Sequence, residues 1–450
     1  MRSHSFPYYI ILSAIIAASP FVGAAQQPRS FSLQEAVLQA TQNNRTLKAN
    51  ALDISIAGEQ VRVAKSLSLP AVQLGAQYLH YFALPAFFGF GENGSNSKIP
   101  FSRIGGRDQF SGTLSASYSI YSPIAAPTIR TARLQERVSR SYYQQSSIDV
   151  AADVQQTYLG ILVLAERLKL QHESLQRNEK ALADSRSLLA QGRGLRVDTL
   201  RAYAAVQSLR PDILKLDYAI EVGKQQLITL MALDSIKQIT LTDSLVVHSR
   251  EAIPSENELY EEALQQRPDL QALELQQQVS EQQTSLAKAA RLPTVSLIGQ
   301  YQLQSQARKF DFTNAYWPSA SFAGAQVVLP LFTGHSNQAK IRQAELAQQQ
   351  SGIRISEAQQ ALKTTVKQVI ANLRETNDRM QTQLKVKEAA LLSYDIVQYR
   401  YEKGVTARLE LTDAELALTA AQLNYLEAVF EYRSAEIELA RTRSKAGLTK

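Results

Sequence analysis

The sequence predicts an α+β membrane protein built as an internal tandem duplication, in which each half combines two amphipathic strands with one long antiparallel helical hairpin. Three observations predict this fold class. Two stretches repeat at a nearly constant offset, apolar residues recur every seven positions over long segments, and short stretches alternate apolar with small polar residues. Heptad spacing indicates packed helices, and alternation indicates strands with two unlike faces.

Residues 1–25 have the pattern of a secretory signal peptide, with a basic start, an apolar run and small residues before Gln26. We therefore expect an exported chain. The sequence has no cysteine, which excludes disulfides, thiolate metal sites and lipid attachment at a cysteine. After the signal no apolar run approaches the ~20 residues of a membrane helix, so any membrane span must be a closed β-barrel. The net charge of +7 is interspersed, and we expect no nucleic-acid partner.

The duplication is visible in matched stretches of the two halves. "AKSLSLPAVQLGAQY" from Ala64 matches "AKAARLPTVSLIGQY" from Ala287 at an offset of 223, whereas Gly192 falls on Gly404 at an offset of 212. The difference of 11 residues lies in a long loop of the first half, at about 83–107. We divide the mature chain into a first repeat at 26–256 and a second repeat at 257–450.

The alternating stretches predict two strands in each repeat. "PAVQLGAQYLHY" places Val72, Leu74 and Tyr78 on one face and glutamines on the other. Strands of about ten residues with such faces are typical of outer-membrane barrels, and four of them cannot close one alone. Several copies must therefore combine, or the strand interpretation is wrong. The four strands are expected at about 70–82, 108–121, 293–304 and 320–332.

The heptad stretches predict a helical hairpin at about 125–232 and another at about 336–443, and an equatorial segment at about 233–256 completes the first repeat. Val154, Ile161 and Leu168 begin the first series, and Leu409 and Leu416 begin the last one. A helix from Ile129 to Ala190 would run roughly 90 Å, far longer than a globular helix. A plain fibrous coiled coil is the alternative, and the strands argue against it.

Two carboxylates, Glu410 and Asp413, follow Gly404 and share one helix face at their spacing of three. They are open to interpretation as an acid/base pair, a metal site, a solvated face or the lining of a pore. No nucleophile or oxyanion donor lies near them, so we expect no catalytic residues. The five histidines are scattered, and we expect neither a metal nor a cofactor.

Four stretches resemble the TolC-type outer-membrane efflux channels, and the resemblance covers essentially the whole mature chain. They are "FSLQEAVLQATQNNRTLKA", "QQRPDLQALE", "LPLFTGHSNQAKIRQAE" and "YEKGVTARLELTDAELAL". The resemblance implies a homotrimer whose strands form one 12-stranded β-barrel in outer-membrane lipid and whose helices form a periplasmic α-barrel. It also implies docking to a periplasmic adaptor and an inner-membrane pump, as the exit duct of a tripartite efflux or type I secretion system.

The same resemblance implies a pore constriction at the hairpin tips. In the family, carboxylates six and nine residues after the turn glycine ring the closed periplasmic mouth, which are Glu410 and Asp413 here. The first half has Asp198 at plus six and Arg201 at plus nine, counted from Gly192. Three chains would place six carboxylates of the second hairpin around one axis, a constriction that favours cations.

The family also closes its mouth with polar links between the hairpins. Tyr401 and Asp198 match one such pair, and the turn glycines Gly192 and Gly404 match the tips. The family's basic residue two positions after the second glycine is Thr406 here, which leaves Arg408 as a substitute. The alternative to an exit duct is a periplasmic adaptor or structural coiled-coil protein of the envelope. The sequence does not identify the cargo as drug, metal or protein.

Overall fold

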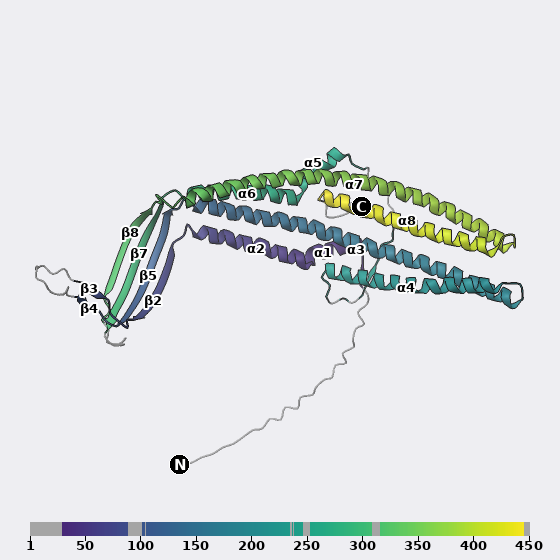
Figure 1. Cartoon of the computed structure of the whole chain (residues 1–450), viewed down its shortest axis with the longest axis horizontal. Coiled ribbons are helices and arrows are strands. Elements are labelled where there is room, and N and C mark those ends of the chain that lie inside the picture. Colours follow the sequence, from purple (N-terminus) through teal and green to yellow (C-terminus); the bar gives the residue numbers. More distant parts are fainter. Residues whose placement is uncertain are drawn as a thin grey trace, which may run out of the picture.

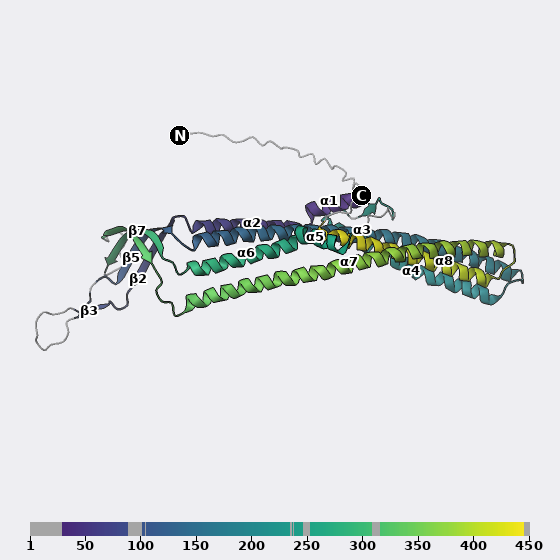
Figure 2. The same cartoon turned by 90° about the horizontal axis from the view of Figure 1, so that it is seen from above.

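The computed structural model describes residues 29–88, 101–103, 105–234, 236, 238–245, 253–307 and 316–444. The predicted signal peptide, much of the 83–107 loop and part of the 233–256 segment lie outside these residues. Figure 1 shows an elongated molecule with a β-sheet at one end and two helical tips at the other. Seen from above, the long helices run along one common axis (Figure 2).

The first half contains ten of the described elements. They are β1 (Arg29–Phe31), α1 (Leu33–Asn43), α2 (Arg45–Ser66), β2 (Ala71–His80), β3 (Ala86–Phe88), β4 (Phe101–Arg103), β5 (Asp108–Tyr121), α3 (Ala125–Ala190), α4 (Arg196–Leu230) and β6 (Ile239–Leu241). The second half has α5 (Glu256–Gln266), α6 (Pro268–Ala289), β7 (Thr294–Ala307), β8 (Ser319–Val328), α7 (Ser336–Glu402) and α8 (Arg408–Thr442).

The two halves repeat the same helices at nearly the same lengths. α1 and α5 have 11 residues each, α2 and α6 have 22 each, and α4 and α8 have 35 each. The longest helices, α3 and α7, have 66 and 67 residues, about 100 Å at 1.5 Å per residue. The tandem duplication is therefore present in three dimensions as well as in sequence.

Matching capping boxes begin the short helices of both halves. The backbone N–H of Ser32 donates to Glu35 at 2.9 Å, and that of Ser255 donates to Glu258 at the same distance. Each serine hydroxyl accepts a bond from the backbone N–H of its glutamate in return. Such reciprocal bonds satisfy amide groups that have no partner within the first helical turn, so both repeats start on the same local signal.

The sheet is antiparallel throughout, with the strand order β2-β5-β7-β8. The register pairs Leu74 with Leu114 and Leu114 with Tyr301, which places these apolar side chains on one face. On the opposite face, Thr113 pairs with Gln302 in a run of neutral polar residues. Among the described strands, β2 and β8 form the two edges of this sheet.

Each helical half has its own apolar core at the middle of the long axis. In the first half Tyr158 and Leu227 are buried with β1 and β6, which pair in parallel, and in the second half Ile370 and Val429 are buried with α5. One described helix, α3, is also long and apolar enough by composition to cross a membrane. This is weak evidence, because half of that apolar stretch is buried within the protein and a core helix passes the same test.

Polar contacts join the two hairpins along the line where α3 lies beside α8. Arg441 donates to Asp149 at 2.8 Å, and Gln156 donates to Ser434 at 2.9 Å. These polar contacts link the two hairpins along this line, which forms the seam between them.

Candidate functional site at the hairpin tips

Both hairpins turn through the same backbone motif. Gly192 and Gly404 have φ angles of +71° and +73°, in the left-handed region that glycine adopts at little cost. At the first tip the N–H of Arg193 bonds to Leu188 O at 2.9 Å. At the second tip the N–H of Val405 bonds to Arg400 O at 2.9 Å. Each tip is a Schellman motif, and each loop returns the chain in five residues.

The carboxylate at plus six follows each turn in the same structural position. Asp198 is the third residue of α4, and Glu410 is the third residue of α8. A negative charge in the first turn of a helix is stabilised by the backbone N–H groups that point toward it. The sequence-predicted residues Asp198 and Glu410 thus occupy equivalent places at the two tips.

Glu410 is bound within its own hairpin. Arg400, in the last turn of α7, donates to Glu410 Oε1 at 3.3 Å, and the Thr406 hydroxyl donates to Oε2. Both side chains of the Arg400 pair are about half exposed, so the ion pair contributes little stability in water. Its effect is to hold the Glu410 carboxylate at the tip in a defined orientation.

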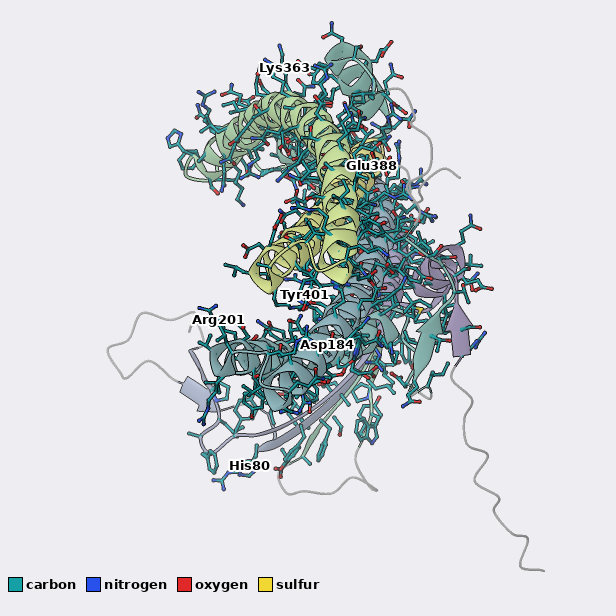
Figure 3. The ribbon with its side chains drawn as sticks, turned by 90° about the vertical axis from the view of Figure 1, so that its right-hand side faces the viewer. His80, Asp184, Arg201, Lys363, Glu388 and Tyr401 are labelled. Carbon is teal, nitrogen blue, oxygen red and sulfur yellow. The ribbon has the colours of Figure 1, made fainter. Side chains whose placement is uncertain are left out.

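Asp413 lies one turn farther along α8 and is exposed. No hydrogen bond or ion pair engages its side chain within the part of the chain that the structure describes. The equivalent residue of the first hairpin is Arg201, which is exposed as well. Figure 3 views the tips end-on, with Arg201 and Asp184 on the first hairpin and Tyr401 on the second hairpin facing them.

The residues predicted to hold the tips together are brought together only in part. The Arg408 guanidinium lies 5.5 Å from the centroid of the Tyr401 ring, a cation–π distance. Among the described contacts of this single chain, no hydrogen bond joins Tyr401 or Arg408 to Asp198. The link between Tyr401 and Asp198 therefore stays a prediction.

Instead of reaching Asp198, Arg408 is directed along its own helix toward Glu415, with 3.5 Å between Nη2 and Oε2. Glu415 is buried on α8. Burial raises the pKa of the Glu415 carboxyl, against the charges of Arg408 and Arg177, which lower it. The tip of the second hairpin is thus connected to a buried carboxylate that the sequence interpretation did not select.

A signal for Glu415 was present in the sequence. Glu415 follows Leu411 by four residues and precedes Leu418 by three, which is the spacing of one helix face. Both leucines are buried, so a carboxylate between them occupies a core position. A charged residue at a core position of a heptad pattern is uncommon and marks a specific partner or function.

The tip carboxylates Glu410 and Asp413 belong to no metal-binding cluster of the described residues. Within that part of the chain, no group of three or more His, Cys, Asp or Glu side chains is arranged to hold a metal ion. Glu410 and Asp413 are both exposed to solvent, whereas a general acid or base that works by a shifted protonation equilibrium is usually enclosed. Glu410 and Asp413 are thus exposed charges at the end of a long helical hairpin.

The sequence matches the family described as "Outer membrane efflux protein" over residues 36–233 and 259–442, most of the chain. The two matched segments correspond to the two halves of the duplication. Most of each hairpin, the sheet, both tips and Glu415 fall within the match.

Similar sequences are found among efflux proteins. The chain is 22% identical over 406 residues to the cation efflux system protein CusC of Escherichia coli, covering 90% of this chain and 84% of that protein. It is 24% identical over 413 residues to the toluene efflux pump outer membrane protein TtgF of Pseudomonas putida, covering 90% of this chain and 82% of that protein.

Solved structures of the same shape include an outer membrane channel and a second outer membrane protein. The Campylobacter jejuni CmeC outer membrane channel superposes with a TM-score of 0.74 at 17% identity, covering 92% of this chain and 85% of that one. The outer membrane protein VceC of Vibrio cholerae superposes with a TM-score of 0.71 at 17% identity, covering 92% and 96%. At this identity the likeness establishes a shared fold.

Proposed function

The chain belongs to the outer membrane efflux protein family, and we propose that it is the exit duct of a tripartite export system, leading cargo from the periplasm to the exterior. Members of this family are transport proteins of the outer membrane, and so is this chain. The observation that carries the proposal is the placement of the sheet and the two hairpin tips at opposite ends of one axis, joined by helices about 100 Å long.

The sheet supplies the membrane end of the proposed duct. Val72 and Leu74 are 65% and 82% exposed on its apolar face, which suits contact with lipid, while the glutamine and serine face suits a water-filled interior. Edge strands of ten residues with such exposure invite aggregation unless another strand covers them. The two edges, β2 and β8, run in opposite directions, so β8 of one copy can pair antiparallel with β2 of the next.

Three copies arranged in this way form a closed ring. Four strands per chain in three chains make the 12-stranded barrel that the family resemblance implies, and six hairpins make the α-barrel beneath it. The arrangement is head-to-tail and closes by rotation, as ring-forming interfaces do. In this ring a neighbouring chain covers each of the two sheet edges.

The helical tips are proposed to meet a periplasmic adaptor, which in turn joins an inner-membrane pump. The relatives named as parts of a cation efflux system and of a toluene efflux pump support such a role for this chain. An adaptor or a structural coiled-coil protein is the competing function. Neither an adaptor nor a structural coiled-coil protein accounts for a four-stranded sheet with an exposed apolar face.

At the tips, Glu410 and Asp413 are proposed to line the periplasmic mouth, with Asp198 of the first hairpin beside them. Six carboxylates from three second hairpins, close to one axis, are stable only with water, cations or a wider opening between them. Arg201 offsets part of this charge from the first hairpin. The mouth is therefore expected to prefer cations and to bind divalent ions.

The test is to express the full chain and examine outer-membrane fractions. We expect a trimer that migrates as one band in detergent without heating, shifts to the monomer on heating, and forms ion channels when the purified trimer is added to a planar bilayer. A chain recovered only from the periplasm, or a trimer without channel activity, would contradict the proposed function. Recovery from the soluble periplasm would favour the adaptor.

A further inference from the structure

The buried carboxylate Glu415 lies two turns beyond the start of α8. It is 8% exposed, and it sits on the stripe that also buries Leu411 and Leu418. An ionised carboxylate in such surroundings costs free energy unless cationic groups and hydrogen bonds offset its loss of water. Glu415 therefore needs cationic partners, and these come from both hairpins.

Toward the tip, Glu415 holds Arg408. The Oε2 to Nη2 distance of 3.5 Å is at the long end for a hydrogen bond, but the Arg408 side chain is three-quarters buried, where water competes less with the attraction. From this position the Arg408 guanidinium lies over the Tyr401 ring in the last turn of α7. A continuous series of contacts thus runs from the buried Glu415 through Arg408 and Tyr401 to the turn at Gly404.

Across the seam, Arg177 of α3 faces the same point. Its Nη2 donates to Thr419 Oγ1 at 3.1 Å, one turn beyond Glu415, and its buried Nε has no acceptor among the described residues. The Arg177 charge lowers the pKa of Glu415, so the two groups interact electrostatically. From α7, Tyr394 faces the site, where burial first and Glu415 second raise the pKa of the tyrosine.

We propose that Glu415 is a positioning residue that keeps the second hairpin tip closed against the first, by holding Arg408 over Tyr401 and by facing the Arg177 charge of α3. The proposal rests on the proposed function, because closure has meaning only in a duct. The contact of Glu415 with Arg408 would hold the tip from a position other than 406, where this chain has Thr406 in place of the family's basic residue.

The energetics separate this role from ordinary structural support. Replacing both members of a buried ion pair by neutral residues changes stability little, because desolvation offsets the attraction, whereas neutralising one member leaves the other charge without its partner. The ion pair does select one arrangement, since Arg408 and Arg177 lose their common counter-charge when the carboxylate is neutralised. Because the Arg408 side chain is 24% exposed and lies near the tip, it can turn toward water when residue 415 is neutral. We therefore expect a neutral side chain of the same shape to leave the fold intact and to release the tip.

The first experiment compares purified wild-type trimer with Glu415→Gln in planar bilayers. We expect the open-state fraction to rise about tenfold, the change that losing one charge-assisted contact of about 1.4 kcal/mol produces. The apparent midpoint of thermal unfolding should stay within about 3 °C of wild type. Glu427→Gln is the matched control, because Glu427 is an exposed carboxylate on the same helix.

A pair of further variants tests the connection. Arg408→Gln alone should open the channel to the same degree, and combining it with Glu415→Gln should add little, because residues acting through one contact are not additive. Additive effects would mean that the two side chains act separately. A Glu415→Gln variant that leaks and also unfolds at a much lower temperature would show a general structural role and overturn the proposal.

A second measurement does not depend on conduction. The chain has no cysteine, so Arg193→Cys with Val405→Cys places one spin label at the matching turn position of each tip. Pulsed electron paramagnetic resonance on the full chain should show a longer or broader label-to-label distance with Glu415→Gln and no change with Glu427→Gln. An unchanged distance would overturn the proposal even if wild-type trimers conduct. Absence of wild-type channels would instead overturn the proposed function.

Discussion

The two hairpin tips have the same backbone and different side chains. Gly192 and Gly404 adopt nearly the same φ, both turns close with the same hydrogen bonds, and an acidic residue is third in each returning helix. At the equivalent positions, however, the first tip has Leu188 where the second has Arg400, and Arg201 where the second has Asp413. The two tips therefore share the backbone turn, whereas the Arg400–Glu410 ion pair is present at the second tip and has no counterpart at Leu188 of the first.

The two tip loops also differ in how closely they approach the preceding helix. At the first tip Gly194 lies so close to α3 that an added Cβ would be 2.8 Å from Leu189 N. The equivalent residue of the second tip is Thr406, whose hydroxyl donates to Glu410. The first loop is folded back on its helix, whereas the second leaves room for a side chain that orients the Glu410 carboxylate.

The largest effect is expected from copying the second tip onto the first. Gly194→Thr would force Cβ into the α3 backbone, so the turn must open, at a cost of about 1–3 kcal/mol. Limited trypsin digestion at Arg193 or Arg196 should become much faster. Thr406→Gly is the matched control, which removes a hydroxyl without a clash. Equal digestion rates for the two variants would show that the tips do not differ in this way.

The turn glycines should behave alike. Gly192→Ala and Gly404→Ala both place a Cβ in a left-handed conformation, with open space around it, so backbone strain alone sets the cost at about 1–2 kcal/mol each. Urea unfolding monitored by helical circular dichroism should show similar shifts of the midpoint. A shift at one glycine alone would mean that the shared backbone motif contributes unequally to stability.

Charge selectivity should change when the first tip is given the charge of the second. Arg201→Asp places a carboxylate where Asp413 stands in the other hairpin and changes the local charge by two units. Each unit charge about 6 Å from an ion in water alters its probability about threefold, so two units alter it about tenfold. The cation preference of the channel, measured from the reversal potential, should rise by that order. Arg210→Gln, farther along α4, is the control. A preference that stays constant would place Arg201 away from the pore.

The smallest effect concerns the opposite end of each repeat. The backbone N–H and the hydroxyl of Ser32 lower the pKa of Glu35, and Ser255 does the same for Glu258. A lowered pKa means that the folded chain binds the proton less tightly than the unfolded one. The contribution is therefore present above about pH 4.3 and is lost as the pH falls through the lowered pKa.

Glu35→Gln and Glu258→Gln should accordingly flatten the acid side of the stability curve by similar small amounts. The urea midpoint between about pH 3 and 6 measures this, with Glu427→Gln as an exposed control. A strong loss for one variant and none for the other would contradict the equivalence of the two capping boxes.

Much of the fold could be predicted because its signals are local. The Gly192 and Gly404 breaks in the heptad pattern lie at the observed turns, and the alternation from Val72 to Tyr78 lies within β2. Each signal needs only chain neighbours, since helices and strands impose periods of 3.6 and 2. The trimer, the 12-stranded barrel and the partners follow from family membership and stay proposals.

The site was predictable only where position along the chain decides it. Asp198 and Glu410 were found by counting from the glycines, whereas the direction of Arg408 depends on which neighbour its long side chain meets. Glu415 and Arg177 are 238 residues apart, a pairing that no local pattern reveals. Their electrostatic interaction arises from the packing of α3 beside α8, which tertiary structure alone establishes.

The most direct test of the proposed mouth is the reversal potential of the purified trimer under a potassium chloride gradient, for wild type and for Glu410→Gln combined with Asp413→Asn. We expect wild type to prefer potassium and the variant to lose most of this preference while keeping its trimer and its helical content. A wild-type channel without cation preference, or a variant with the wild-type reversal potential, would contradict the placement of these carboxylates at the mouth of the duct.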